Sequence, residues 1–281
     1  MGLGERLQYL DRRVIFLVIL LVILIPYVKP IGLPIRVSKE AAAFYDAIER
    51  VPPGSTVFLA ADYDAASLPE LYPMTLTAIE QCFRRNLKIV GFCLWPGGPP
   101  LLNRALAEVA PRHGKQYGVD YVNLGFKDGQ EAVMVMVGAS IRDAFPADFN
   151  GTPVASIPVM HGIQNFSNVH VLINISAGYP GTKEWVQQVG SRFRNALGQS
   201  IPIVSGCTAV SAPEYYAYVN AGQLDGLLGG LAGAAEYEKQ VGIMGTATRG
   251  MDTQSLAHVA IIAFIILGNI LGRGAGRKHA A

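Results

Sequence analysis

Two carboxylates follow the first apolar run of the central part of the chain. Asp62 and Asp64 lie just beyond residues 55–60 and are two positions apart. Side chains at this spacing point to the same side while the backbone stays extended. Such a pair can bind a cation or carry out acid/base chemistry, but aspartate is also a favoured residue at the beginning of a helix. We favour capping and retain both residues as candidates for catalysis and ligand binding.

A cysteine and a histidine are the other candidates for catalysis. Cys207 follows the apolar run 201–205, and His161 lies earlier in a segment rich in proline, glycine and asparagine. The thiolate is the reactive form of cysteine, and a helix that begins nearby can stabilise it. Free cysteines are nevertheless among the most buried residues. We favour a buried structural cysteine, with a nucleophile as the alternative.

Further candidates for ligand contact follow the other apolar runs. With the two aspartates, the set is Asp62, Asp64, Trp95, Ser176, Ser205 and Thr208. If the runs are parallel strands, these residues gather at the carboxyl edge of the sheet, which is the usual ligand site of an open α/β fold. The glycines around them can equally form simple tight turns.

The common sequence motifs of metal sites, nucleotide sites and serine hydrolases are missing from the sequence. It contains no HExxH, CxxC or GxSxG motif, and residues 176–183 lack the Gly-Lys-Ser/Thr ending of a phosphate-binding loop. We therefore expect no metal and no cofactor. Lys+Arg 23 against Asp+Glu 21 leaves a net charge of +2, too even for a nucleic-acid-binding surface. The 3 cysteines cannot form a disulfide framework.

The elements that must position these residues alternate along the chain. The runs expected as strands are 55–60, 87–94, 121–124, 169–175 and 201–205, and the expected helices are 39–50, 70–85, 101–109, 130–145 and 183–197. Near-continuous apolar strands separated by helices are typical of a parallel sheet covered on both faces. We predict an α/β fold with a Rossmann-like, mostly parallel sheet flanked by helices. Residues 146–168 form a long connection, which indicates a lid, a partner surface or a misassigned element.

Uncharged apolar segments lie near both ends of the 281-residue chain. Residues 14–28 span about 22 Å as a helix, short of a ~30 Å hydrocarbon core, so the following residues must complete the crossing. The expected organisation is an N-terminal segment (1–13), a transmembrane helix (14–35), an α/β domain (36–252), a second transmembrane helix (253–272) and a basic tail (273–281). A signal peptide is the alternative for the first span, but no small-x-small cleavage site follows it.

Cations flank these segments on the side of the chain ends. Arginines precede the first span, and Arg273, Arg277 and Lys278 follow the second. Cations next to membrane spans mark the cytoplasmic side. We therefore expect a two-pass protein of the cell membrane with both termini in the cytoplasm and the α/β domain outside it.

Glycines recur every three or four positions late in the domain. Gly222, Gly226, Gly230 and Gly233 would fall on one face of a helix. Each glycine costs a helix about 1 kcal/mol relative to alanine, so a stripe of them needs a compensating close contact. We predict an interface with the sheet, a neighbouring helix, another subunit or the membrane face.

The second span repeats this pattern. Gly268 and Gly272 form a GxxxG motif, and the polar Asn269 lies between them. Small and polar residues within a span commonly contact a neighbouring helix. The expected partners are the lipid bilayer and either further copies of this chain or other membrane subunits.

One block of sequence resembles a known family. Residues 212–216 (Ala-Pro-Glu-Tyr-Tyr) and the glycine-rich stretch 222–238 are similar to an uncharacterised family of membrane-anchored α/β proteins with no known activity. The likeness extends to 62–64 and 69–71. It implies a membrane-anchored arrangement and no mechanism.

Two functions follow from these observations. The first is a non-enzymatic scaffold, assembly or ligand-sensing subunit of a membrane complex, based on the glycine patterns and the missing catalytic motifs. The alternative is a membrane-bound hydrolase that uses the strand-end crevice, with Cys207, His161 or the two aspartates as its reactive groups.

Overall fold

The computed structural model describes residues 11–29, 31–194 and 198–278, which belong to two compact units. One unit, Ile35–Ala247, is the α/β domain. The other unit consists of the segments that precede and follow this domain in the sequence.

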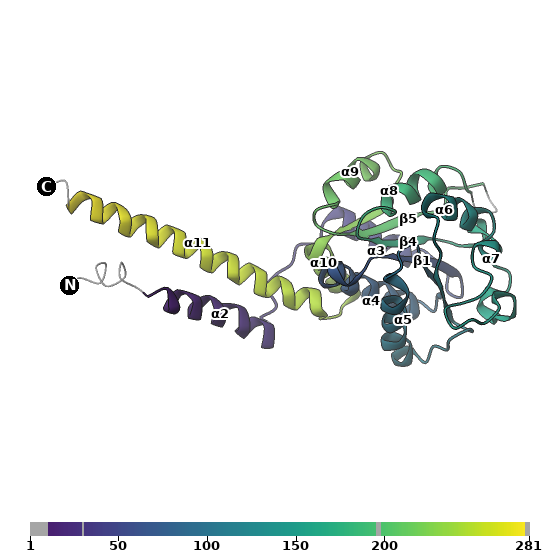
Figure 1. Ribbon diagram of the computed structural model, residues 1–281, viewed down its shortest axis with the longest axis horizontal. Coiled ribbons are helices and arrows are strands. Elements are labelled where there is room, and N and C mark those ends of the chain that lie inside the picture. The colour runs from purple at the N-terminus through teal and green to yellow at the C-terminus, as the bar shows by residue number, and fades with distance from the viewer. Residues whose placement is uncertain (1–10, 30, 195–197, 279–281) are drawn as a thin grey trace. The chain divides into compact units, whose positions relative to one another are not determined.

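A six-stranded sheet forms the centre of the α/β unit (Figure 1). Its strands are β1 (Thr56–Asp62), β2 (Lys88–Cys93), β3 (Tyr121–Phe126), β4 (Leu172–Ser176), β5 (Ile203–Cys207) and β6 (Gly226–Gly229). Their order is β3-β2-β1-β4-β5-β6, and all neighbouring pairs are parallel. The chain builds outward from β1 to β3, crosses back, and builds outward again from β4.

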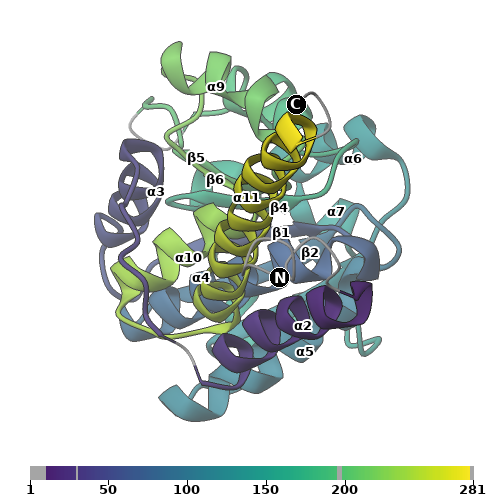
Figure 2. The same ribbon diagram turned by 90° about the vertical axis from the view of Figure 1, so that its left-hand side faces the viewer.

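Helices cover both faces of this sheet (Figures 1 and 2). One face carries α3 (Lys39–Glu49), α4 (Leu68–Arg84), α5 (Gly98–Val109) and α10 (Gly230–Val241), and the other carries α6 (Gln130–Ala139), α7 (Ile141–Ala144), α8 (Thr182–Trp185) and α9 (Ala212–Asn220). Because both faces are covered, the strands need apolar residues on both sides. Every residue of β1, β4 and β5 is accordingly buried.

The predicted fold class is therefore confirmed as an α/β fold with a Rossmann-like parallel sheet flanked by helices. Each run expected as a strand forms one, displaced by at most three residues at its ends. The predicted helix 130–145 is interrupted, because Ser140 has an extended backbone and its hydroxyl accepts a hydrogen bond from the N–H of Asp143, which begins a new turn. The predicted helix 183–197 is α8 followed by a π-helical turn, η6 (Val186–Gly190), with 195–197 outside the described residues.

Short 3₁₀ turns lie in some of the connections between these elements. They are η1 (Ala65–Ser67), η2 (Ala110–His113), η3 (Val154–Ser156), η4 (Pro158–Met160) and η5 (Phe166–Asn168). The last three lie within the long connection 146–168, where Val154, Met160 and Phe166 are buried in the core. This connection thus packs on the sheet as part of the domain.

The prediction of a glycine-striped helix is wrong. Gly222 lies in a turn with a φ of +68°, Gly226 belongs to β6, and Gly230 begins α10 with a φ of +59°. A Cβ on Gly226 would lie 2.4 Å from the Cα of Phe44 in α3, and a Cβ on Gly233 would lie 2.9 Å from the backbone of Leu228. The close approach inferred from these two glycines exists, but it is made inside the domain by different elements.

The second unit contains α2 (Arg12–Val28) and α11 (Thr246–Lys278), the latter beginning at the end of the α/β unit. Of the described helices, one is long and apolar enough to cross a membrane, over Thr246–Ile270 of α11. The expectation of such a helix at each end is therefore not met: α2 has 17 residues and ends at Val28, and the part of the first span expected at 29–35 is not helical where it is described.

A buried carboxylate connects the two segments of this second unit. Asp252 of α11 is 1% exposed and accepts hydrogen bonds from the backbone N–H groups of Ile31, Gly32 and Leu33 at 2.8–2.9 Å. These groups follow the end of α2 and have no helical partners of their own, and an unpaired backbone donor is costly away from water. Asp252 thus fixes the chain that leaves α2.

Candidate functional site

The loops that follow the strands meet at the carboxyl edge of the sheet. The order of the strands reverses between β1 and β4, so the loops after these two strands lead to opposite faces. In open parallel sheets such a reversal leaves a crevice in which ligands bind. The candidate residues are therefore placed relative to this edge.

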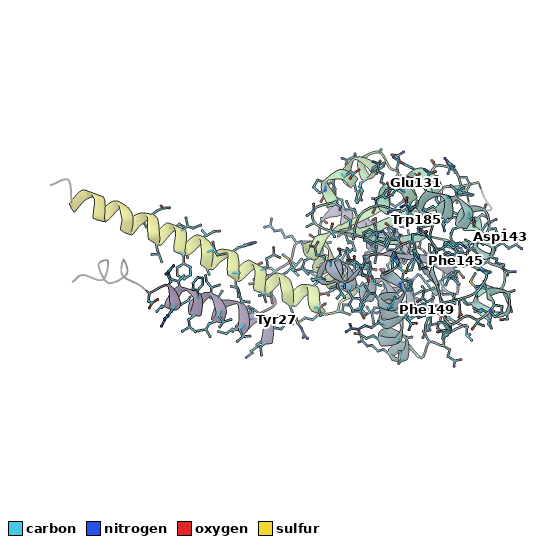
Figure 3. All side chains as sticks on the ribbon, in the orientation of Figure 1. Tyr27, Glu131, Asp143, Phe145, Phe149 and Trp185 are labelled. Carbon is cyan, nitrogen blue, oxygen red and sulfur yellow. The ribbon has the colours of Figure 1, made fainter. Side chains whose placement is uncertain are left out.

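Asp62 is the last residue of β1 and is completely buried. Its Oδ1 accepts a hydrogen bond of 2.7 Å from the N–H of Leu94, in the loop after β2. Its Oδ2 accepts hydrogen bonds from Nδ2 of Asn174 in β4 at 3.1 Å and from the indole Nε1 of Trp185 in α8 at 3.2 Å. Trp185 lies inside the α/β unit (Figure 3). One carboxylate thereby joins both sides of the strand-order reversal.

Burial changes the protonation of this carboxyl group. Removal from water disfavours its charged form and raises the pKa of Asp62 to about 7, although the hydrogen bonds from Leu94, Trp185 and Asn174 act in the opposite direction. Asp62 thus titrates near neutral pH.

A ladder of buried polar side chains continues from Asp62 across β4 and β5. The Oδ1 of Asn174 accepts hydrogen bonds from Ser176 at 2.9 Å and from Thr182 at 3.2 Å. The hydroxyl of Thr182 also contacts the hydroxyl of Ser205. All four side chains are buried. Ser176 and Ser205, expected to contact a ligand, instead bond to protein and hold the beginning of α8 against the sheet.

Asp64 performs the capping role that its position predicted. Its carboxylate accepts a hydrogen bond of 3.0 Å from the N–H of Ala66 at the start of η1. Asp62 and Asp64 therefore serve different elements and do not act as a pair. In the parts of the chain that the structure describes, no group of three or more His, Cys, Asp and Glu side chains is arranged to hold a metal ion.

The structure separates the residues expected for nucleophilic catalysis. Cys207 is the last residue of β5, whereas η4, directly before His161, is bonded to the chain just before β3: the N–H of Val159 donates to the carbonyl of Gly118 at 2.8 Å. Cys207 thus lies at the carboxyl end of β5, whereas the segment before His161 lies beside the amino end of β3, and β4, β1 and β2 stand between β5 and β3.

Asp62 is also too far from Cys207 to activate it. Ser176 of β4 pairs with Asp62 on one side and with Cys207 on the other, which separates the two residues by two strand spacings, roughly 10 Å. Cys207 is completely buried, its Sγ contacts the carbonyl of Leu228, and burial raises the pKa of its thiol to about 12. These features fit the structural cysteine favoured from the sequence.

Thr208 lies in the loop between β5 and α9. Its side chain is half-buried, and its hydroxyl lies 3.0 Å from that of Ser211. The next residue, Ala209, donates its N–H to Glu70 of α4 at 2.8 Å. Thr208 is thus part of a turn that is bonded to α4, and it does not line the cavity at this edge.

A cavity of about 450 Å³ opens among the loops that follow β2, β3 and β4. Its lining residues are Leu94, Trp95, Pro96, Phe126, Asp128, Gln130, Tyr179 and Pro180. Ligand sites in proteins commonly have volumes of about 300–1,000 Å³. Of the sequence candidates, Trp95 lines this cavity. Leu94, which also lines the cavity, connects it to Asp62, because its backbone N–H donates a hydrogen bond to the carboxylate of Asp62.

Sequence reasoning missed most of this lining. Phe126 is 39% exposed and Tyr179 is 56% exposed, although both are large apolar side chains. Phe126 is the last residue of β3 and Tyr179 lies in the loop after β4, and this position at the ends of strands is the signal that could have indicated them. Gln130 has a φ of +50°, which is uncommon for a residue with a side chain.

A second cavity of about 340 Å³ lies beside the first. It is formed by the end of β3 and the segment 144–149, with Phe126, Lys127, Asp148 and Phe149 in its lining. Figure 3 labels Phe145 and Phe149 of this segment. Asp148 is occupied by protein donors, because it accepts from the hydroxyl of Tyr117 at 2.7 Å and from the N–H of Thr152 at 2.7 Å.

No protein-family model and no curated protein matches the chain. A solved structure of a trehalose-6-phosphate synthase, OtsA, aligns with 82% of this chain and 44% of its own, at 10% identity and a TM-score of 0.31. The chain thus spans less than half the length of that synthase, and a likeness at this TM-score supports no statement about activity.

Proposed function

We propose that the protein is a membrane-anchored, non-enzymatic ligand-sensing subunit that binds a small molecule at the carboxyl edge of its sheet. The observation that carries this proposal is the cavity of about 450 Å³ lined by Trp95, Phe126 and Tyr179 at the carboxyl ends of three different strands. The cavity lies beside the strand-order reversal, where open α/β folds bind their ligands.

Exposed apolar side chains support the membrane anchor. On α11, Val259, Ile262, Ile265, Ile266 and Ile270 are each more than half exposed. Apolar surface of this extent is unfavourable in water and favourable in lipid. We propose that Thr246–Ile270 spans the cell membrane.

A second crossing at the N-terminal end is the finer part of this proposal. The side chains of Phe16, Leu20, Leu24 and Ile25 of α2 are about half exposed or more. The 17 residues of α2 cover roughly 25 Å, so local thinning of the bilayer or snorkelling of flanking residues must compensate. We propose a two-pass protein with both termini in the cytoplasm and the α/β domain outside it, because cations accompany the chain ends.

A binding role agrees better with the site than the hydrolase alternative does. Cys207 is buried with a raised thiol pKa, the segment before His161 is bonded to the chain at the amino end of β3, and Asp62 is enclosed by its donors. The cavity itself offers aromatic, amide and carboxylate groups. These groups can bind a ligand, and none of the proposed reactive residues Cys207, His161 and Asp62 is among them.

We also propose assembly with other copies of this chain or with other membrane subunits, and one of the two glycine patterns supports it. The stripe 222–233 is used within the domain, so the support for assembly lies in α11. Gly268 has nothing within 4 Å of a Cβ built on it, and Asn269 is exposed on the same helix. Gly268 and Asn269 thus leave a small and polar part of α11 open.

Equilibrium dialysis tests the function. Full-length protein in lipid nanodiscs is dialysed against a cell extract of small molecules, and the retained compounds are identified by mass spectrometry. We expect the wild type to retain at least one compound unchanged, the Trp95→Ala variant to lose it, and the Phe149→Ala variant, altered in the neighbouring cavity, to keep it. Consumption of the compound would favour the hydrolase, and equal retention by all three proteins would exclude the site.

A further inference from the structure

We propose that the ligand of the carboxyl-edge cavity is an organic cation, a small molecule that carries an alkylated or primary ammonium group. This inference rests on the proposed function and specifies its ligand class. It is carried by the combination of three aromatic rings and one carboxylate in the lining of a single cavity.

The aromatic rings provide the recognition surface. Trp95 and Tyr179 come from the loops after β2 and β4, Phe126 is the last residue of β3, and the three line the cavity together. The face of an aromatic ring attracts a cation within about 6 Å, and tryptophan does so most strongly. Phe126 and Tyr179 are too exposed to be explained by core packing alone.

Hydrogen bonds fix two of these rings in place. The indole Nε1 of Trp95 donates to the carbonyl of Pro180 at 3.0 Å. The hydroxyl of Tyr179 is shared between Oε1 of Gln130 at 3.0 Å and Oε1 of Glu131 at 3.3 Å. A site whose side chains are already held needs less ordering when the ligand binds. In the described part of the chain, no arginine or lysine side chain lies over the ring face of Trp95 or Tyr179.

The charges around the cavity favour a positive ligand. Among the described residues that line the cavity, Asp128 carries the charge. A second carboxylate, that of Glu131, is close to the cavity because it accepts a hydrogen bond from the lining residue Tyr179. The nearby cations are directed elsewhere: Lys127 lines the second cavity, and Lys183 pairs with Glu214 at 3.4 Å. An anionic ligand would therefore meet a carboxylate without a compensating cation, which is unfavourable.

Calorimetric titration of cation and isostere pairs tests this inference. Choline and acetylcholine are titrated into the full-length protein in nanodiscs, alongside 3,3-dimethylbutan-1-ol and 3,3-dimethylbutyl acetate, which have the same shape without the charge. We expect saturable binding of at least one cation, at least about tenfold tighter than its neutral isostere, since several ring faces contribute. Equal binding within either pair, or no cation binding at millimolar concentration, would overturn the inference.

Three single variants locate the binding. Trp95→Leu and Phe126→Leu each remove one ring while keeping an apolar side chain, and Asp128→Asn removes the charge. We expect each to weaken cation binding roughly three- to tenfold and to leave the weak binding of the isostere unchanged. Phe149→Leu, in the second cavity, is the matched control and should bind as the wild type does. Thermal unfolding of every variant establishes that it is folded.

The dialysis experiment separates the two proposals. If the retained compound is neutral or anionic and its retention depends on Trp95, the organic cation is excluded while the ligand-sensing function stands. If no compound is retained in a Trp95-dependent way, both proposals are overturned.

Discussion

The indole Nε1–H of Trp185 donates a hydrogen bond to Oδ2 of Asp62 over 3.2 Å, between α8 and the end of β1. The same carboxylate accepts from Leu94, whose neighbour Trp95 lines the cavity at this edge. A buried polar network of this kind stabilises a single arrangement only while all its members are paired. Asp62 therefore positions the loops that form the cavity without itself lining it.

Replacing Asp62 by alanine removes the acceptor of three buried donors, on Leu94, Asn174 and Trp185. Since one buried unpaired donor costs about 1–3 kcal/mol, we expect Asp62→Ala to lower the free energy of unfolding by roughly 3 kcal/mol or more. Urea unfolding followed by circular dichroism measures this loss. The matched control is Asp64→Asn, because asparagine caps a helix as well as aspartate does. A similar loss in both variants would contradict the role assigned to Asp62.

The titration of Asp62 gives the protein a specific pH dependence. Its pKa is about 7 in the folded state and near 3.8 in the unfolded chain, so the folded state binds more protons between these values. Stability therefore falls as pH rises from about 4 to about 7, by at most about 1.4 kcal/mol per pH unit, and this contribution is constant at higher pH.

Comparison with Asp62→Asn isolates that contribution, because asparagine does not titrate. We expect the free energy of unfolding of the wild type, minus that of the variant, to decrease across this pH window. A difference that is flat, or that increases with pH, would show that burial does not raise this pKa.

The three cysteines are buried and unpaired, and burial raises the thiol pKa of Cys82, Cys93 and Cys207. Since the thiolate is the reactive form, we expect none of them to react with a maleimide until the protein is denatured. A cysteine introduced at Val210, which is 91% exposed in the loop after β5, should then be the single labelled site.

This silent background makes Val210→Cys a test of topology. If the α/β domain lies outside the cytoplasm, a membrane-impermeant maleimide labels the variant in intact cells. Labelling that requires cell lysis would place the domain inside and reverse the proposed orientation. The wild-type protein is the control for both cases.

Gly226 and Gly222 lie in the same glycine-rich segment but differ in their surroundings. A Cβ on Gly226 would meet the backbone of Phe44, which cannot move without shifting α3. We expect Gly226→Ala to destabilise the domain by about 1–3 kcal/mol or more, the range for an overpacked core. Gly222→Ala meets nothing within 4 Å and should cost about 1–2 kcal/mol, from its positive φ alone. Thermal unfolding ranks the two, and the reverse order would contradict the assigned contacts.

Gly268 tests the remaining basis for assembly. Its open position in α11 accepts a larger side chain, so Gly268→Ile should leave folding unchanged. If this face contacts another helix in the membrane, the variant loses the oligomer or the partner, because backbones that approach through glycine are forced apart. Native mass spectrometry in a mild detergent measures the assembly, with Gly268→Ala as the conservative control. An unchanged mass would exclude this face as the interface.

The sequence by itself determined the class of the fold and most of its strands. The runs at 55–60 and 169–175 are continuous apolar segments, and β1 and β4 lie within three residues of them because a strand covered on both faces needs such a segment. The capping role of Asp64 was also local information. The apolar residues of α11 likewise indicated a helix long and apolar enough to cross a membrane, without any knowledge of the fold.

Only the tertiary structure decided what the glycines and the strand-end residues do. The spacing of Gly226 and Gly230 fits a helix, but Gly226 lies in β6, where the backbone of Phe44, far away in the sequence, occupies the place of a side chain and so requires glycine. The cavity joins Trp95 with Phe126 and Tyr179 through the order of the strands. Local sequence patterns indicate which face of a helix or strand is buried. Which other element covers that face is decided by contacts between segments that are distant in the sequence.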